Sequence, residues 1–136
     1  MITGVNHITF SVKNLDESLA FYHDILGFKL LAKWPKGVYL LAGDMWLALI
    51  LDQKTREKEL PEYTHIAFTI SPDDFNLMAA EIKSSGAKVW QDNSSEGESL
   101  YFLDPNGHKL EIHASDLATR LKTAKGNPWE GLQFFE

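Results

Sequence analysis

Apolar and polar residues alternate in two stretches of the chain that match each other. Residues 7–12 read His-Ile-Thr-Phe-Ser-Val, and residues 65–70 read His-Ile-Ala-Phe-Thr-Ile. This alternation is typical of a half-buried strand, because successive side chains of a strand point to opposite faces. Each stretch therefore predicts a strand with an apolar face and a histidine on the other face. The match between them predicts an internal repeat.

A helical pattern follows each strand. The first helix is expected to begin at Leu15 and end before Gly27, with an apolar face made of Leu19, Phe21, Tyr22, Ile25 and Leu26. The second is expected to begin at the capping sequence Ser71-Pro72-Asp73-Asp74 and to end before Gly86, with Phe75, Leu77, Met78 and Ile82 buried. Glycine suits both positions because it tolerates the backbone conformation that ends many helices.

Three short strands are expected after each helix. They lie at about Lys29–Lys33, Gly37–Leu41 and Met45–Leu51, and at about Lys88–Gln91, Ser99–Leu103 and Lys109–His113. The order βαβββ twice predicts an α+β fold of paired modules, forming a curved, partly open mixed-sheet cavity. We expect a single domain over residues 1–136: repeat 1 at about 4–51, repeat 2 at about 63–113, and a C-terminal helix and tail over 116–136.

Composition narrows the class of protein. The 136 residues are 44% hydrophobic and 24% charged, which is ordinary for a globular domain. A net charge of −6 without a basic tract argues against binding to nucleic acid or anionic membranes. The N-terminus lacks the features of a signal peptide, so a cytoplasmic location is expected. The chain contains no cysteine, which excludes a thiol nucleophile from the protein itself.

A hairpin near the C-terminal end carries candidate chemistry. Asp104-Pro105-Asn106-Gly107 is a strong turn sequence, and Glu111 and His113 share one face of the strand that follows. A carboxylate on the inner face of a sheet must be solvated, paired or bound to metal, because burying it alone is costly.

The histidines of the two repeats are possible partners for this carboxylate. His7, His65 and Glu111 lie on three different predicted strands, and such a set forms a facial triad for a divalent metal. The alternative is that each histidine is an ordinary core or surface residue. His113 is a rival third ligand, whereas His23 and His108 are expected to be exposed to solvent.

Three further features allow either a structural or a functional interpretation. The oxygen-rich stretch 91–99 is either a mobile polar loop or a site for a hard cation. Arg120 is either a solvated charge or an anion clamp. Four aromatic residues form part of the core or line a ligand cavity: Trp34, Tyr39, Trp46 and Tyr63.

Several motifs together resemble the fosfomycin-resistance thiol transferases of the vicinal oxygen chelate superfamily. They are Gly-Val-Asn-His-Ile-Thr at 4–9, Ala-Phe-Tyr at 20–22, Leu-Gly-Phe at 26–28, Tyr-Thr-His-Ile-Ala-Phe at 63–68, Asn-Ser-Ser-Glu-Gly-Glu-Ser at 93–99 and Tyr-Phe-Leu-Asp-Pro-Asn-Gly-His-Lys-Leu-Glu at 101–111. The hairpin motif is common across the superfamily, whereas the loop at 93–99 is the sharper indication of the glutathione-using branch. The resemblance covers nearly the whole chain and implies a homodimeric, metal-dependent glutathione transferase that opens the epoxide of fosfomycin.

The resemblance also implies roles for individual residues. The implied Mn²⁺ ligands are His7, His65 and Glu111. Thr9 is placed beside the epoxide oxygen, and Tyr39 assists ionisation of the thiol. The implied K⁺ loop consists of Asn93, Ser95, Gly97 and Ser99, with Glu96 close by. The implied phosphonate contacts are Ser95, Ser99, Tyr101 and Arg120, and the pocket is lined by Trp46 and Tyr63.

Two positions depart from the family pattern. Gln91 stands where the family usually has a lysine that binds the phosphonate, and Ser94 stands where a basic residue is usual. Other interpretations remain open from the sequence alone. They are an Fe(II) extradiol dioxygenase, a glyoxalase-like enzyme, and a metal-free protein that sequesters a drug.

Overall fold

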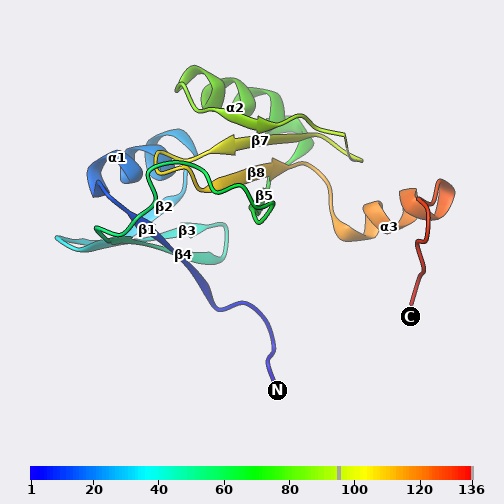
Figure 1. The fold of residues 1–136 in the computed structure, drawn as a ribbon, viewed down its shortest axis with the longest axis horizontal. Coiled ribbons are helices and arrows are strands. Elements are labelled where there is room, and N and C mark those ends of the chain that lie inside the picture. Colours follow the sequence, from blue (N-terminus) through cyan, green and yellow to red (C-terminus); the bar gives the residue numbers. More distant parts are fainter. Residues whose placement is uncertain (95, 136) are drawn as a thin grey trace.

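Two βαβββ units follow one another in the computed structural model, which describes residues 1–94 and 96–135 (Figure 1). The first unit consists of β1 (His7–Val12), α1 (Leu15–Leu19), the π-helix η1 (Ala20–Ile25), β2 (Lys29–Trp34), β3 (Gly37–Ala42) and β4 (Met45–Leu51). The second consists of β5 (Ile66–Thr69), α2 (Pro72–Ser84), β6 (Val89–Gln91), β7 (Ser99–Leu103) and β8 (Lys109–His113), and α3 (Leu117–Gly126) follows it. The predicted α+β repeat is confirmed, with small shifts at the ends of elements.

Each unit forms its own four-stranded sheet. The strand orders are β1-β4-β3-β2 and β5-β8-β7-β6, so the two sheets have the same topology. In each, the first strand pairs in parallel with the last, and the other pairs are antiparallel. Within the described residues no strand pairing joins the sheets, so they remain open. In the same part of the chain, no helix is long and apolar enough to cross a membrane.

The first helix changes its winding halfway along. Its N-terminus is capped by Asn14, whose Oδ1 accepts a hydrogen bond from the Glu17 amide at 2.9 Å. From Ala20 onward the turns widen, and the Leu26 amide donates to the Phe21 carbonyl at 3.0 Å. The widened segment buries both Phe21 and Tyr22. A single helix was predicted here, and periodicity alone does not distinguish the wider turn.

One apolar core is shared by the two units. Two pairs of rings make contact between the units. The ring centroids of Phe21 and Phe102 are 6.1 Å apart, and those of Phe28 and Phe68 are 5.0 Å apart. The core contains residues of both sheets and of the helices that cover them: Phe10, Val12, Phe21, Tyr22, Leu26, Val38, Leu40, Leu47, Leu49, Phe75, Ala79, Ile82, Leu100, Phe102, Leu110 and Ile112. The helix-facing sides of both sheets are therefore buried together, which leaves their opposite faces for other contacts.

A buried carboxylate joins the units at the β7–β8 turn. Asp104 Oδ2 accepts a hydrogen bond of 2.7 Å from the Tyr22 hydroxyl. Its Oδ1 accepts hydrogen bonds of 2.9 Å from the backbone amides of Asn106 and His108. Burial raises the pKa of Tyr22 well above its usual value, and the neighbouring Asp104 charge raises that pKa further. Tyr22 therefore remains a neutral hydroxyl donor to Asp104.

The same turn reaches into the first unit through two more side chains. Asn106 Nδ2 donates to Ser18 Oγ at 3.1 Å, and His108 Nε2 lies 2.8 Å from the Ser11 carbonyl oxygen. A carbonyl oxygen only accepts, so His108 Nε2 carries the proton. His108 is only 7% exposed, so the prediction that it faces solvent is wrong. The turn inserts between the units instead of projecting from them.

The linker between the units also passes closely over this turn. Gly107 has φ +89°, and a Cβ there would lie 2.6 Å from the backbone nitrogen of Glu59. Glycine is therefore required at this position for two reasons: the positive φ, and the close approach of the linker backbone.

We expect Tyr22→Phe to lower the free energy of unfolding by about 1–3 kcal/mol, because it leaves a buried carboxylate oxygen without a donor. Urea unfolding followed by circular dichroism measures the change. Tyr63→Phe is the control, since the Tyr63 side chain is 60% exposed; it should change the free energy by less than about 0.5 kcal/mol. Equal effects of the two substitutions would show that the Tyr22–Asp104 bond does not stabilise the junction.

Candidate metal and substrate site

Four predicted residues lie together on the face of the first sheet that is turned away from the helices. In the strand register His7 is opposite Trp46, and Ala48 lies between Thr9 and Tyr39. Cross-strand partners share a face, so the small Ala48 separates the two hydroxyl-bearing side chains. We call His7, Thr9, Tyr39 and Trp46 the first half-site.

His7 is oriented by its neighbours on this face. Its Nδ1 lies 2.6 Å from the side-chain oxygen of Asn6, and its ring stacks on Trp46 with centroids 4.2 Å apart. Because an amide oxygen only accepts, Nδ1 carries the proton and Nε2 keeps its lone pair. The Trp46 Nε1 is buried and has no acceptor within the described residues. The first half-site thus presents one free ligand nitrogen and one unpaired donor.

The corresponding face of the second sheet carries the other predicted residues. Glu111 is opposite Ala67 on one side and Tyr101 on the other, and Gln91 is opposite Tyr101. In the next row His113 is opposite Ser99. His65 directly precedes β5, whose first residue is Ile66. We call His65, Ser99, Tyr101 and Glu111 the second half-site.

His65 and Glu111 form a pair that requires a cation. His65 Nδ1 donates to the Tyr63 carbonyl oxygen at 2.9 Å, which leaves the lone pair of Nε2 facing Glu111 Oε1 at 3.1 Å. Glu111 is 6% exposed, and its oxygens only accept. A proton on the imidazole or a metal ion between the two groups resolves this arrangement. Imidazole nitrogen and carboxylate oxygen are common ligands of divalent transition metals, so the residues fit such an ion.

His113 contacts Glu111 directly, with its Nδ1 3.5 Å from Glu111 Oε2, and also through Ser99. The Ser99 hydroxyl lies 2.6 Å from Glu111 Oε2 and 2.6 Å from His113 Nδ1. Since the hydroxyl has one proton and the carboxylate only accepts, Ser99 donates to Glu111 and accepts from His113. In this arrangement the lone pair of His113 is on Nε2, which lies beside the Glu96 carboxylate and not beside the His65–Glu111 pair. The geometry favours Glu111 over His113 as the third ligand.

Glu96 connects the oxygen-rich loop to the C-terminal helix. Its carboxylate accepts a hydrogen bond of 2.7 Å from Ser115 Oγ and one of 3.4 Å from Arg120 Nε. His113 Nε2 lies 3.8 Å from the same carboxylate. Arg120, predicted as a surface charge or anion clamp, is therefore ion-paired beside the second half-site.

The predicted potassium loop is partly described. Asn93 Nδ2 donates to the Gly97 carbonyl at 2.9 Å, which closes the loop upon itself. Gly97 has φ +77°, and a Cβ there would lie 2.8 Å from Ser115 Cβ. Ser95, predicted to contact both K⁺ and the phosphonate, lies outside the described residues.

An aromatic cluster surrounds His65 and includes a residue that the sequence analysis missed. Trp90 lies 5.2 Å from both the His65 and Tyr101 rings, measured between centroids, and its Nε1 donates to the Leu110 carbonyl. The strand register shifts between Val89 and Gln91, so simple alternation does not assign the face of Trp90. Gln91 Nε2 donates to the Tyr63 hydroxyl at 3.0 Å, at the edge of this cluster.

The two half-sites are not brought together within one chain. Across residues 1–94 and 96–135 there is no group of three or more metal-binding side chains. Trp34, Tyr39, Trp46 and His7 form one series of ring contacts, and Tyr63, His65, Trp90 and Tyr101 form another. The predicted triad is therefore split, with His7 apart from His65 and Glu111.

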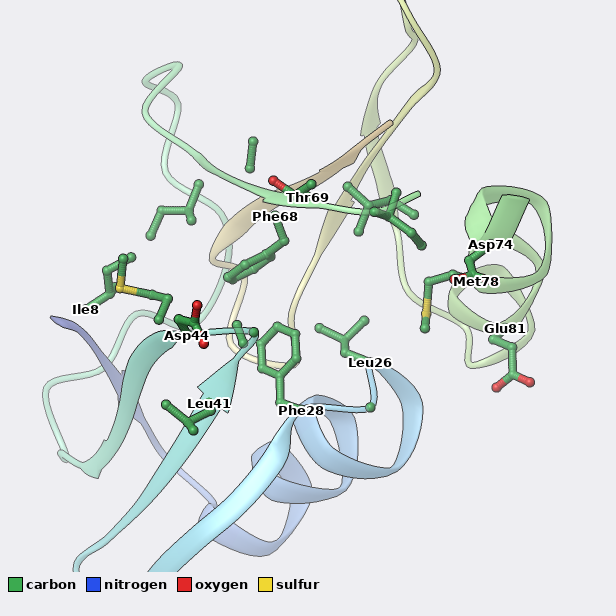
Figure 2. Close-up of a pocket in the computed structure, with 18 of the residues that line it drawn as sticks. Ile8, Leu26, Phe28, Leu41, Asp44, Phe68, Thr69, Asp74, Met78 and Glu81 are labelled. Carbon is green, nitrogen blue, oxygen red and sulfur yellow. The ribbon is translucent and has the colours of Figure 1, made fainter. Parts of the chain in front are cut away.

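A larger cavity lies elsewhere, at the junction of the two units. It has a volume of about 880 Å³ and a mostly apolar lining that includes Phe28, Phe68 and Met78 (Figure 2). None of the predicted site residues that the structure describes lines it. We attribute it to the open junction between the units, because the polar groups suited to chemistry lie on the opposite sheet faces.

Comparisons with known proteins agree with the fold and with the motifs. The family model "Glyoxalase/Bleomycin resistance protein/Dioxygenase superfamily" matches residues 4–112. Glutathione transferase FosA of Serratia marcescens is 40% identical over 136 residues, covering 98% of this chain and 96% of the relative. Metallothiol transferase FosB of Staphylococcus epidermidis is 40% identical over 129 residues, covering 92% and 93%. The structure of the fosfomycin resistance protein FosX from Listeria monocytogenes with Mn(II) and sulfate matches with TM-score 0.77 and 31% identity, covering 90% and 98%.

The chain therefore belongs to the Glyoxalase/Bleomycin resistance protein/Dioxygenase superfamily, whose paired βαβββ architecture it shares. Its relatives in this superfamily include the transferases FosA and FosB and the fosfomycin resistance protein FosX.

We expect Glu111→Gln to abolish tight Mn²⁺ binding, because glutamine removes the charge that faces His65. His113→Ala should weaken binding by only about 10–100-fold, as is usual for residues that orient a ligand. Calorimetric titration of each purified variant with Mn²⁺ gives both affinities. The reverse order, with His113→Ala the more damaging change, would assign the third ligand to His113.

Proposed function

We propose that this protein inactivates fosfomycin by adding the thiol of glutathione to its epoxide at a Mn²⁺ site. The observation that carries the proposal is the pair formed by His65 Nε2 and buried Glu111 Oε1, 3.1 Å apart with no proton between them in the neutral histidine. The similarity to a glutathione transferase over 98% of the chain supports this choice of activity.

The proposed metal ligands are His7, His65 and Glu111. A bound divalent cation would supply Lewis acidity at the epoxide oxygen and offset the phosphonate charge. The chain's own part is to hold two neutral imidazoles with their Nε2 atoms free. The hydrogen bonds from Nδ1 to Asn6 and to Tyr63 do this.

We propose that the site is completed in a homodimer. His7 is exposed and lies apart from the other two ligands in its own chain, and Trp46 Nε1 lacks an acceptor within the described residues. A two-fold axis that places the first half-site of one copy over the second half-site of the other builds two equal sites. Each site then contains His65 and Glu111 of one copy together with His7 of the partner subunit.

Thiol addition to an epoxide balances without a leaving fragment. One carbon–sulfur bond forms, one carbon–oxygen bond breaks, and the proton lost by the thiol ends on the former ring oxygen. In the proposal Tyr39 assists ionisation of the thiol, and the Thr9 hydroxyl stabilises the charge that develops on the oxygen. The thiol comes from outside, because the chain contains no cysteine.

The second half-site and its surroundings are proposed to bind the phosphonate. The proposed contacts are Ser95, Ser99, Tyr101, Gln91 and Arg120, with Trp46 and Tyr63 lining the pocket. A K⁺ ion held by Asn93, Ser95, Gly97 and Ser99, with Glu96 nearby, would add positive charge beside them.

Phosphorus NMR of fosfomycin tests the activity directly. The protein is supplied with Mn²⁺ and K⁺ and incubated with glutathione, cysteine, bacillithiol or no thiol in parallel. We expect a glutathione adduct to form fastest and no product without thiol. Formation of a diol without thiol would identify a hydrolase, and unchanged fosfomycin in every sample would overturn the proposal.

The Gln91 position yields a quantitative expectation for this activity. Gln91 Nε2 donates to the Tyr63 hydroxyl, so it lies at the proposed pocket, but it brings no charge. A hydrogen bond from a charged group is stronger than a neutral one, so Gln91→Lys should raise kcat/KM for fosfomycin by about tenfold. Steady-state kinetics on Gln91→Lys and Gln91→Ala measure this. Equal values for parent, lysine and alanine variants would mean that residue 91 does not contact the substrate.

Potassium should raise the rate of fosfomycin turnover well above the rate measured in sodium at equal ionic strength. K⁺ is larger and gives up its hydration shell more easily, which suits a loop of neutral oxygens with one nearby carboxylate, Glu96. The measurement is turnover in matched KCl and NaCl solutions, with Glu96→Gln as the variant expected to lose the difference. Identical rates for the parent in the two salts would exclude the potassium loop.

A further inference from the structure

A second cavity is lined by one residue of each half-site. It has a volume of about 440 Å³, within the usual size of small-molecule sites. Its lining includes Thr9 of the first half-site and His65 of the second, together with Ser11, Arg56, Thr64 and Lys109. Arg56 comes from the linker, which the sequence analysis treated only as a connection. The cavity therefore places a charged segment without an assigned role beside one residue of each of the two proposed reaction sites.

Most polar groups around this cavity already have partners. Lys109 Nζ donates to the Glu62 carbonyl at 2.6 Å and lies 5.0 Å from the centre of the Trp90 ring. His108 Nε2 is bound to the Ser11 carbonyl, and Asp52 Oδ1 accepts from the Lys54 amide at 2.9 Å. The guanidinium of the half-buried Arg56, by contrast, has no hydrogen-bond or ion-pair partner within residues 1–94 and 96–135.

The backbone holds Arg56 at the cavity. The Asp52 amide donates to the Val12 carbonyl at 2.9 Å, which ties the start of the linker to the end of β1. Thr55 is 5% exposed, and its Oγ1 donates to the Asp52 carbonyl at 2.6 Å. Arg56 directly follows this buried turn, so its position is fixed by the fold although it belongs to the linker.

We propose that Arg56 binds a carboxylate of the thiol co-substrate and thereby positions the thiol beside the proposed metal site. The inference rests on the proposed function. Glutathione, cysteine and bacillithiol all carry carboxylates, and a guanidinium binds a carboxylate through two parallel hydrogen bonds. The chain carries a net charge of −6, which opposes the approach of an anionic thiol. An unpaired cation such as Arg56 at this cavity offsets that repulsion locally.

Arg56→Gln tests the proposal in steady-state kinetics. We expect its KM for glutathione to rise about tenfold, because a neutral hydrogen bond replaces a charged one. The kcat at saturating thiol and the KM for fosfomycin should stay unchanged. Arg56→Lys should recover part of the loss. With 2-mercaptoethanol, which has no carboxylate, Arg56→Gln and the parent should have equal kinetics.

Lys54→Gln is the matched control, since it removes one positive charge from the same segment at an exposed position. It should leave the KM for glutathione unchanged. An unchanged KM for glutathione in Arg56→Gln would overturn the proposal, as would an equal loss with 2-mercaptoethanol. A rise in the KM for fosfomycin instead would assign Arg56 to the phosphonate and overturn the assignment to the thiol.

Binding of S-methylglutathione separates this inference from the proposed function. This ligand has the carboxylates of glutathione and cannot react, so calorimetry measures its affinity without turnover. About tenfold weaker binding to Arg56→Gln than to the parent would support the site even if fosfomycin were not a substrate. Equal binding to both proteins, or no binding to either, would reject it.

Discussion

The buried Asp104 carboxylate is the interaction on which the arrangement of this molecule depends. It accepts hydrogen bonds from Tyr22 in the first unit and from its own turn in the second. Asn106 and His108 extend the same turn into the first unit. A buried charge is stable only when its acceptor sites are satisfied, so the two units must keep this relative position. The β7–β8 hairpin thus forms part of the interface between the two units as well as a turn.

This junction determines where the chemistry can occur. Because the helix-facing sides of both sheets share one core, the faces that carry His7 and Glu111 are left for contacts outside that core. Among residues 1–94 and 96–135, each face alone is incomplete. One has a free imidazole nitrogen and an unpaired indole N–H, and the other has a histidine–carboxylate pair that needs a cation. In the proposed homodimer, a symmetric pair of chains would satisfy both faces with one interface.

Local patterns in the sequence were sufficient to predict the repeat, the strands and the faces on which the site residues lie. Alternation at period two placed His7 and Thr9 on one face and Glu111 on the corresponding face of the other sheet, as observed. The burial of His108 and the split between the half-sites depend on how the units pack, which no local pattern encodes. Trp90 was missed because the strand register shifts beside it. The roles of the site residues stay predictions.

A heterodimer of two defective chains tests the shared site most directly. One chain carries His7→Ala and the other carries Glu111→Ala, with different affinity tags so that the mixed dimer can be isolated after co-expression. Each variant alone should be inactive towards fosfomycin. A shared site leaves one of the two sites of the mixed dimer intact, so about half of the parent activity should return. An isolated heterodimer without activity would contradict a site built from two copies.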